Sequence, residues 1–256
     1  MKLSSEKKHD AMTDDAFYRL TELDRTTWPE IRDQILQFEH VESLSEPRSY
    51  PGYPHWPLAH VSARLWPPLD RVLRARRSQR RLGTDLPARK TLSRLLLFAH
   101  GVHAELARGP VPSSGGLQSL ELYLVNFATG WLPTGLYHYD RAGHHLAQIA
   151  KDADRLHWQS IVPSLPLVEG SVLLWVLVGD GARIAKKYGP RGNRFLLLEA
   201  GHLMQNLCLL SASLGLGTVP LGGFFEGEVR RAFTLLPTDV VAYLGVLGGP
   251  ATPLAA

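Results

Sequence analysis

The chain has 256 residues, 45% of them hydrophobic and 20% charged, which is enough for a sizeable core in one large domain or two small ones. The net charge of +4 does not by itself favour nucleic acid, and the single cysteine excludes an internal disulfide and fits a reducing compartment. The polar N-terminus does not read as a signal peptide, and no apolar run reaches the roughly 18 residues of a membrane span. We therefore expect a cytoplasmic protein with neither nucleic-acid nor membrane partners.

Residues 1–65 form a region of their own, rich in charge, tryptophan and proline. A helix is expected around Trp28–Glu39, because Pro29 suits a first helical turn. The stretch Ser49–Pro57, SYPGYPHWP, has three prolines among aromatic residues. It is expected to be an extended segment laid over another part of the protein rather than a regular element. We divide the chain into this N-terminal arm and a main domain, residues 66–256.

The main domain mixes helices and strands without the regular alternation of a doubly wound sheet. Short apolar runs predict three strands, and helical spacing predicts two helices and a short helical stretch. The strands are Leu120–Phe127, Val172–Val178 and Val240–Leu247; the helices are Leu69–Leu73, Thr91–Ala104 and Phe195–Leu214. The last helix is apolar on nearly all faces, so we expect it to be central and buried on most sides.

The hexapeptide RRSQRR, Arg76–Arg81, places four arginines around one serine. A basic run of this kind is often only a solvated face. The Ser78 hydroxyl among guanidinium groups also suits a phosphate, whose oxygens match the planar fork of arginine. Nucleic acid is a minor alternative, because no extended basic tract surrounds the hexapeptide.

Two glycine-containing stretches and one cysteine are further candidates. Pro110–Gln118 (PVPSSGGLQ) and Pro220–Phe224 (PLGGF) are either ordinary turns or places where backbone approaches a ligand closely. The histidines have no metal-ligand spacing, so no metal is expected. Cys208 lies within the apolar helix and is expected to be an inert core thiol.

Six stretches in order resemble the SagB-type (thiazoline/oxazoline dehydrogenase) branch of the FMN-dependent nitroreductase superfamily, which includes azoline oxidases. They are YPGYP (residues 50–54), RRSQR (76–80), PSSGGLQSLELYLV (112–125), GLYHYD (135–140), KYGPRGNRFLLLEAGHLMQNL (187–207) and LGLGTVPLGGF (214–224). The resemblance implies an α+β sandwich with a mostly antiparallel sheet flanked by helices. It also implies an intertwined homodimer with FMN at the subunit interface.

The resemblance assigns the FMN-binding residues to three stretches. Arg76 and Ser78 would hold the phosphate with Arg77 beside them, and Arg80 would stabilise the reduced pyrimidine edge. The second stretch, which comes from the other subunit and covers the flavin, supplies Pro112, Ser113 and Ser114, with Gln118. The third stretch lies along the flavin ring and supplies Pro220, Leu221, Gly222 and Gly223. Many nitroreductases have Glu where this chain has Gly222. No Lys or Arg follows Arg231, so the phosphate would rely on residues 76–81.

Lys187 and Tyr188 align with the Lys-Tyr pair associated with proton removal in azoline oxidases. A lysine acts as a base only when burial or nearby cations favour its neutral form. The alternative is that KKYGPRG is a charged turn before the apolar helix.

The leading hypothesis is an FMN-dependent dehydrogenase acting on a thiazoline, oxazoline or similar heterocycle of a peptide or carrier-bound intermediate in natural-product biosynthesis. A cyclodehydratase or carrier protein is the expected presenting partner. The alternatives are an NAD(P)H-dependent nitro or quinone reductase and a non-catalytic flavin-fold scaffold in a modifying complex.

Overall fold

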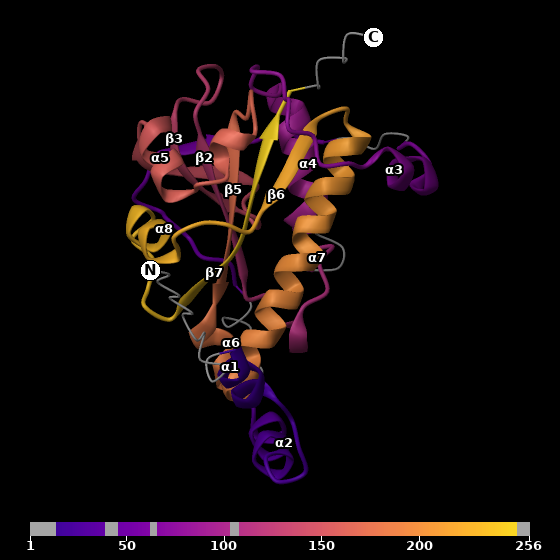
Figure 1. Ribbon diagram of the computed structural model, residues 1–256, viewed down its shortest axis with the longest axis vertical. Helices are drawn as coiled ribbons and strands as arrows, with labels where there is room; N and C mark the ends of the chain where they lie inside the picture. Colours follow the sequence, from indigo (N-terminus) through magenta and orange to yellow (C-terminus); the bar gives the residue numbers. More distant parts are fainter. Residues whose placement is uncertain (1–13, 39–45, 62–65, 103–107, 250–256) are drawn as a thin grey trace, which may run out of the picture.

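The computed structural model describes residues 14–38, 46–61, 66–102 and 108–249. Within them one antiparallel sheet has the strand order β1-β4-β3-β2-β5-β7-β6 and separates two helical layers (Figure 1). The strands are β1 (His55–Pro57), β2 (Leu120–Asn126), β3 (Gly135–Asp140), β4 (His145–Lys151), β5 (Leu173–Asp180), β6 (Gly217–Leu221) and β7 (Asp239–Gly248). The expected α+β fold with an antiparallel sheet flanked by helices is confirmed.

The α-helices are α1 (Asp14–Thr21), α2 (Trp28–Gln37), α3 (Leu69–Ala75), α4 (Arg89–His100), α5 (Arg155–Ile161), α6 (Gly181–Tyr188), α7 (Gly192–Ser213) and α8 (Glu226–Ala232). Three short 3-10 turns complete the described elements: η2 (Ser114–Gly116), η3 (Leu165–Leu167) and η4 (Gly189–Arg191). Helices α4 and α7 cover one face of the sheet, and α5 and α8 cover the other (Figure 1).

Strand β2 shows how the apolar sequence builds both faces of the sheet. Leu122 and Leu124 belong to the core beneath α4 and α7, whereas Tyr123 and Val125 belong to the core beneath α5 and α8. Successive side chains of a strand point to opposite faces, so a strand covered on both sides is apolar throughout. All seven residues of β2 are buried, which explains the apolar run over residues 122–125; the polar Glu121 and Asn126 are buried with hydrogen-bond partners.

Helix α7 is the longest helix described, with 22 residues, and lies along the sheet. Its inner side is buried, but Leu197 and Leu198 are 43% and 56% exposed, so one side of the apolar helix is open in a single chain. By length and composition the helical stretch Gly181–Ser213 could cross a membrane. Of its most apolar window 44% is buried inside the protein, and the core helix of a soluble protein passes the same test.

Two expected elements differ in the structure. The expected helix over Thr91–Ala104 ends earlier, at His100, where Gly101 donates to the Leu96 and Leu97 carbonyls and the chain becomes extended. Residues 103 and 104 lie outside the described residues. The expectation that Ser49–Pro57 holds no regular element is wrong, because His55–Pro57 forms β1 against β4. Proline is tolerated there because an edge strand need not donate every N–H.

A buried charge cluster joins the N-terminal arm to the sheet. The Arg48 guanidinium donates to both carboxylate oxygens of Asp239, and its backbone N–H donates to Glu121 Oε1 over 3.0 Å. Tyr50 and Tyr123 share a hydrogen bond of 2.9 Å between their hydroxyls. These contacts fix the segment after residue 45 across one end of the sheet.

Candidate functional site: two half-sites along one helix

The basic hexapeptide leaves α3 in extended conformation and runs beside the start of β6. Arg76 is the residue at which α3 ends, and the Gln79 N–H donates to the Thr218 carbonyl of β6 over 3.4 Å. The Leu82 N–H, just beyond the hexapeptide, donates to the Glu169 carbonyl over 2.9 Å. The backbone is therefore held at both ends, and the side chains between are free to face a ligand.

The side chains of this segment fit a phosphate. Arg77, Ser78 and Arg80 are exposed and Arg76 is half-buried. Within the part of the chain that the structure describes, Arg81 is paired with Glu169 at 3.8 Å, whereas Arg76, Arg77 and Arg80 have no carboxylate within ion-pair distance. Adjacent guanidinium groups repel one another, so an anion with several oxygens would be favoured here.

The glycine pair follows the other end of the same strand. Gly222 and Gly223 are exposed, and a Cβ built on Gly222 meets no atom within 4 Å. Pro220 is half-buried, while Leu221 packs in the core, so only the backbone of Leu221 is available to a ligand. Strand β6 thus joins a cationic end to an open, side-chain-free end, which suits a molecule with a phosphate at one end and a flat ring at the other.

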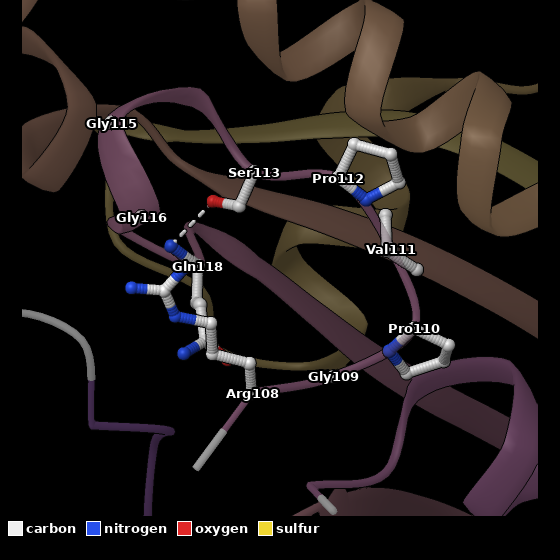
Figure 2. A pocket seen from close by; sticks show the side chains of 9 residues that line it. All are labelled: Arg108, Gly109, Pro110, Val111, Pro112, Ser113, Gly115, Gly116 and Gln118. Carbon is white, nitrogen blue, oxygen red and sulfur yellow. Dashed lines mark hydrogen bonds between the residues drawn. The ribbon is translucent and has the colours of Figure 1, made fainter. Parts of the chain in front are cut away.

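The loop before β2 forms the second half-site. Nine residues of the segment 108–118 line a pocket of about 500 Å³, all except Ser114 and Leu117. In Figure 2, Pro110, Val111 and Pro112 lie one after another along the loop. Beyond them the Ser113 hydroxyl accepts a hydrogen bond from the Gln118 N–H. The Gln118 side chain accepts a hydrogen bond from Arg141, and its carbonyl accepts one from Arg183 over 3.1 Å. Gln118 therefore holds the loop in place as well as lining the pocket.

Lys187 and Tyr188 lie against this loop, although Lys187 is 72 positions beyond Gly115 in the sequence. A Cβ built on Gly115 would lie 2.6 Å from Tyr188 Oη and 2.7 Å from Lys187 Nζ. Both side chains are half-buried. The structure therefore brings together two stretches that the sequence marked separately, the Ser-Ser-Gly-Gly turn and the Lys-Tyr pair.

Glu199 of α7 is a site residue that the sequence analysis missed. Its carboxylate accepts a hydrogen bond of 2.6 Å from the Ser114 N–H, and the residue is only 3% exposed. A single acid within an otherwise apolar helical run was the available signal, because a buried carboxylate needs a hydrogen-bond donor. Its donor comes from the loop that precedes β2, so the reason for its position appears only in three dimensions.

Burial sets the protonation of the groups beneath the loop. Burial raises the pKa of Glu199, and the hydrogen bond from Ser114 opposes this only in part. Burial also raises the pKa of Tyr188, and the nearby Glu199 charge raises it further. Tyr188 therefore stays protonated in neutral solution and is suited to donate a hydrogen bond.

The two half-sites lie at different heights along α7. Ser114 contacts Glu199, whereas the charge of Arg76 acts on Cys208, nine positions further along the helix. At a rise of about 1.5 Å per residue the two positions are separated by roughly 13 Å along the axis. Figure 1 shows the same separation, with α3 beside one end of α7 and α6 beside the other.

The sequence analysis also considered Cys208 and a metal site. Cys208 is buried and burial raises its pKa, which fits an unreactive thiol. Among the residues that the structure describes, no group of three or more His, Cys, Asp or Glu side chains is placed to hold a metal ion.

The fold is an α+β sandwich in which helices cover both faces of an antiparallel sheet. The Nitroreductase family matches residues 73–249, and the chain belongs to this family. The nitroreductase-like protein MJ1384 of Methanocaldococcus jannaschii is 30% identical over 163 residues, which cover 64% of this chain and 82% of that protein.

Solved structures show the same fold. A nitroreductase-like protein of Ralstonia eutropha has a TM-score of 0.67 at 24% identity and covers 81% of this chain and 95% of its own. A chain of the Escherichia coli microcin synthetase McbBCD complex, with truncated pro-MccB17 bound, has a TM-score of 0.58 at 20% identity and covers 94% and 93%. A nitroreductase-like protein of Desulfovibrio desulfuricans in complex with FMN has a TM-score of 0.52 at 20% identity and covers 74% and 90%. FMN is the cofactor of this family, as the sequence predicts.

Proposed function

We propose that the protein is an FMN-dependent dehydrogenase that aromatises a thiazoline, oxazoline or similar heterocycle carried by a peptide or a carrier protein. The observation that carries the proposal is the contact of Lys187 and Tyr188 with Gly115. It joins the pair that the resemblance associates with proton removal to the loop expected to cover the flavin. Aromatising such a ring removes one hydride and one proton, so a hydride acceptor and a base must act at one place.

The residues of this chain have distinct roles in the proposal. Arg76, Arg77 and Ser78 bind the phosphate, and Arg80 places positive charge toward the ring, where bound FMN accepts the hydride. Lys187 takes the substrate proton. Tyr188, which burial keeps protonated, orients the substrate by donating a hydrogen bond.

The active form in the proposal is a homodimer. The proposal takes the two half-sites of each flavin from different chains, since within one chain they are separated by roughly 13 Å along α7. The exposed side of α7, with Leu197 and Leu198, is an apolar surface suited to a second copy. Two α7 helices packed in opposite directions would place the Lys-Tyr half-site of one chain beside the arginine half-site of the other.

The McbBCD chain supports the choice of substrate class. Its fold covers 94% of this chain, against 81% for the Ralstonia eutropha protein, so the likeness extends further than the FMN-binding part alone. By analogy with that complex, we propose that a synthetase partner presents the substrate. We propose a division into an arm, residues 1–65, and an FMN-binding domain, residues 66–256, with strand β1 of the arm extending the sheet of that domain.

The family itself favours a second candidate, an NAD(P)H-dependent nitro or quinone reductase. One set of assays separates the two. The purified protein is tested for released FMN, then for oxidation of a thiazoline peptide and for reduction by NAD(P)H with a nitroarene or quinone. Turnover with NAD(P)H alone and none with the azoline would establish the reductase, and a protein without flavin would favour a scaffold.

Variants of the Lys-Tyr pair test the assignment within the leading proposal. Lys187→Ala is expected to retain flavin but to lose azoline turnover about 100- to 10,000-fold, because it removes the general base. Tyr188→Phe is expected to retain flavin and to lose turnover because it removes the hydrogen bond that orients the substrate. Lys187→Ala should also lose the ascending limb of the pH–rate profile. The matched control is Lys186→Ala, since Lys186 is exposed and adjacent. Wild-type turnover in the Lys187 variant would show that another group takes the proton.

A further inference from the structure

Helix α2 contacts the end of α6 that carries the Lys-Tyr pair. The Gln34 side chain donates from Nε2 to the Ala185 carbonyl over 3.0 Å and to the Lys186 carbonyl over 3.1 Å. Both carbonyls lie in the last turn of α6, where the Ala185 carbonyl also accepts a hydrogen bond from the Gly189 N–H. Gln34 thereby fixes the backbone that directly precedes Lys187.

Phe38, which follows α2, contacts the lysine side chain itself. Lys187 Nζ lies 5.1 Å from the centre of the Phe38 ring and 5.6 Å from that of Tyr188. An aromatic face attracts an ammonium group within about 6 Å. The lysine is thus held between its neighbouring tyrosine and a residue of the N-terminal arm.

The position of α2 is not explained by core packing. None of its ten residues is buried and it contacts α6, while Phe38, the residue that follows it, packs against the core beneath α4 and α7. Figure 1 shows it projecting beyond the sheet at the end where α6 lies. A helix that buries so little gains little stability from packing. Its hydrogen bonds and ring contact instead converge on residues 185–187.

We propose that α2 is a positioning element of the active site, with Gln34 holding the backbone before Lys187 and Phe38 holding its side chain beside Gly115. The proposal rests on the proposed function for the role of Lys187 in proton removal. Gln34 and Phe38 are positioning residues, which act through Lys187 and not on the substrate. The N-terminal arm would then contribute to catalysis in every subunit.

Lysine labelling tests the proposal without substrate or flavin. The apoprotein is acylated briefly with an amine-reactive ester, and mass spectrometry gives the ratio of label on Lys187 to label on the exposed neighbour Lys186. Gln34→Ala removes the two hydrogen bonds to α6, and Phe38→Leu removes the aromatic ring beside Lys187. Each change should raise the labelling ratio about two- to five-fold. Gln37→Ala is the matched control, because Gln37 is exposed on the same helix, and Phe38→Tyr retains the aromatic face. Both controls should keep the wild-type ratio.

Kinetics on the flavin-loaded protein complete the test. Gln34→Ala and Phe38→Leu should lower kcat for the azoline about three- to ten-fold, with KM and flavin content unchanged. Phe38→Tyr, which keeps an aromatic ring at this position, should have the wild-type kcat. An unchanged labelling ratio, or an equal effect of Gln37→Ala, would overturn the proposal. Wild-type turnover of Lys187→Ala would contradict the proposed function instead, while the labelling ratio would still decide whether α2 holds the lysine.

Discussion

A methyl group on Gly115 would act directly on the contact that carries the proposed function. Gly115 has φ +61°, and a Cβ there would lie 2.6 Å from Tyr188 Oη, whereas ordinary contact begins at 3.4 Å. The hydroxyl must therefore move by about 0.8 Å, the difference between these two distances. A misplacement of about 1 Å near reacting groups can cost on the order of 100-fold in rate. We expect Gly115→Ala to lower azoline turnover about 10- to 100-fold.

The neighbouring glycine provides the control. Gly116 has φ +73°, and a Cβ there meets nothing within 4 Å. Alanine at either position has a left-handed backbone, which costs roughly 1–2 kcal/mol. Urea unfolding should therefore show similar losses of stability in the two variants, because the atoms displaced by Gly115→Ala are at the ends of side chains. Only Gly115→Ala should lose turnover at equal flavin content. Equal turnover in the two variants would refute the assigned geometry.

Two further predictions concern the phosphate and the buried acid. Arg76→Ala combined with Ser78→Ala should lower FMN occupancy, because each charge-assisted hydrogen bond contributes roughly 1.5–3 kcal/mol; full flavin content after dialysis would contradict the phosphate assignment. Glu199→Gln should change the pH dependence of stability. The folded-state pKa of Glu199 lies above its ordinary value of 4.5, so its stabilising contribution is complete below 4.5 and is lost as the pH rises through the raised value. Urea unfolding across this range should show a smaller decline in Glu199→Gln, and an identical decline would contradict the burial argument.

Strongly apolar segments could be read from the sequence alone. The strands around Leu124 and Trp175 and the helix around Leu203 are apolar because helices cover the sheet on both faces, so composition alone indicates them. The pairing of His138 with Glu121 inside the sheet gives no such signal, because each residue is polar until the fold buries both. The sequence analysis accordingly recognised strand β3 only as a stretch resembling a family.

In the candidate site too, residues within one short segment could be predicted from the sequence, whereas contacts between distant segments could not. Local composition indicated the arginines beside Ser78 and the glycines after Leu221, since their chemistry lies within a few residues. The contact between Gly115 and Lys187 could not be predicted, because it depends on how α6 packs beside the loop before β2. The role of Phe38 depends on a third segment and carries no local pattern.

The separation of the half-sites leads to a prediction that depends on subunit exchange. A chain with Arg76→Ala and Ser78→Ala retains Lys187, and a chain with Lys187→Ala retains the arginines. If each site takes one half from each subunit, every mixed dimer has one complete site and one site lacking both halves. Unfolding and refolding equal amounts of the two inactive variants gives half mixed dimers, so about a quarter of wild-type turnover should return. If both halves of a site belonged to one chain, no mixture could regain activity, and a flavin-loaded active monomer in sedimentation would lead to the same conclusion.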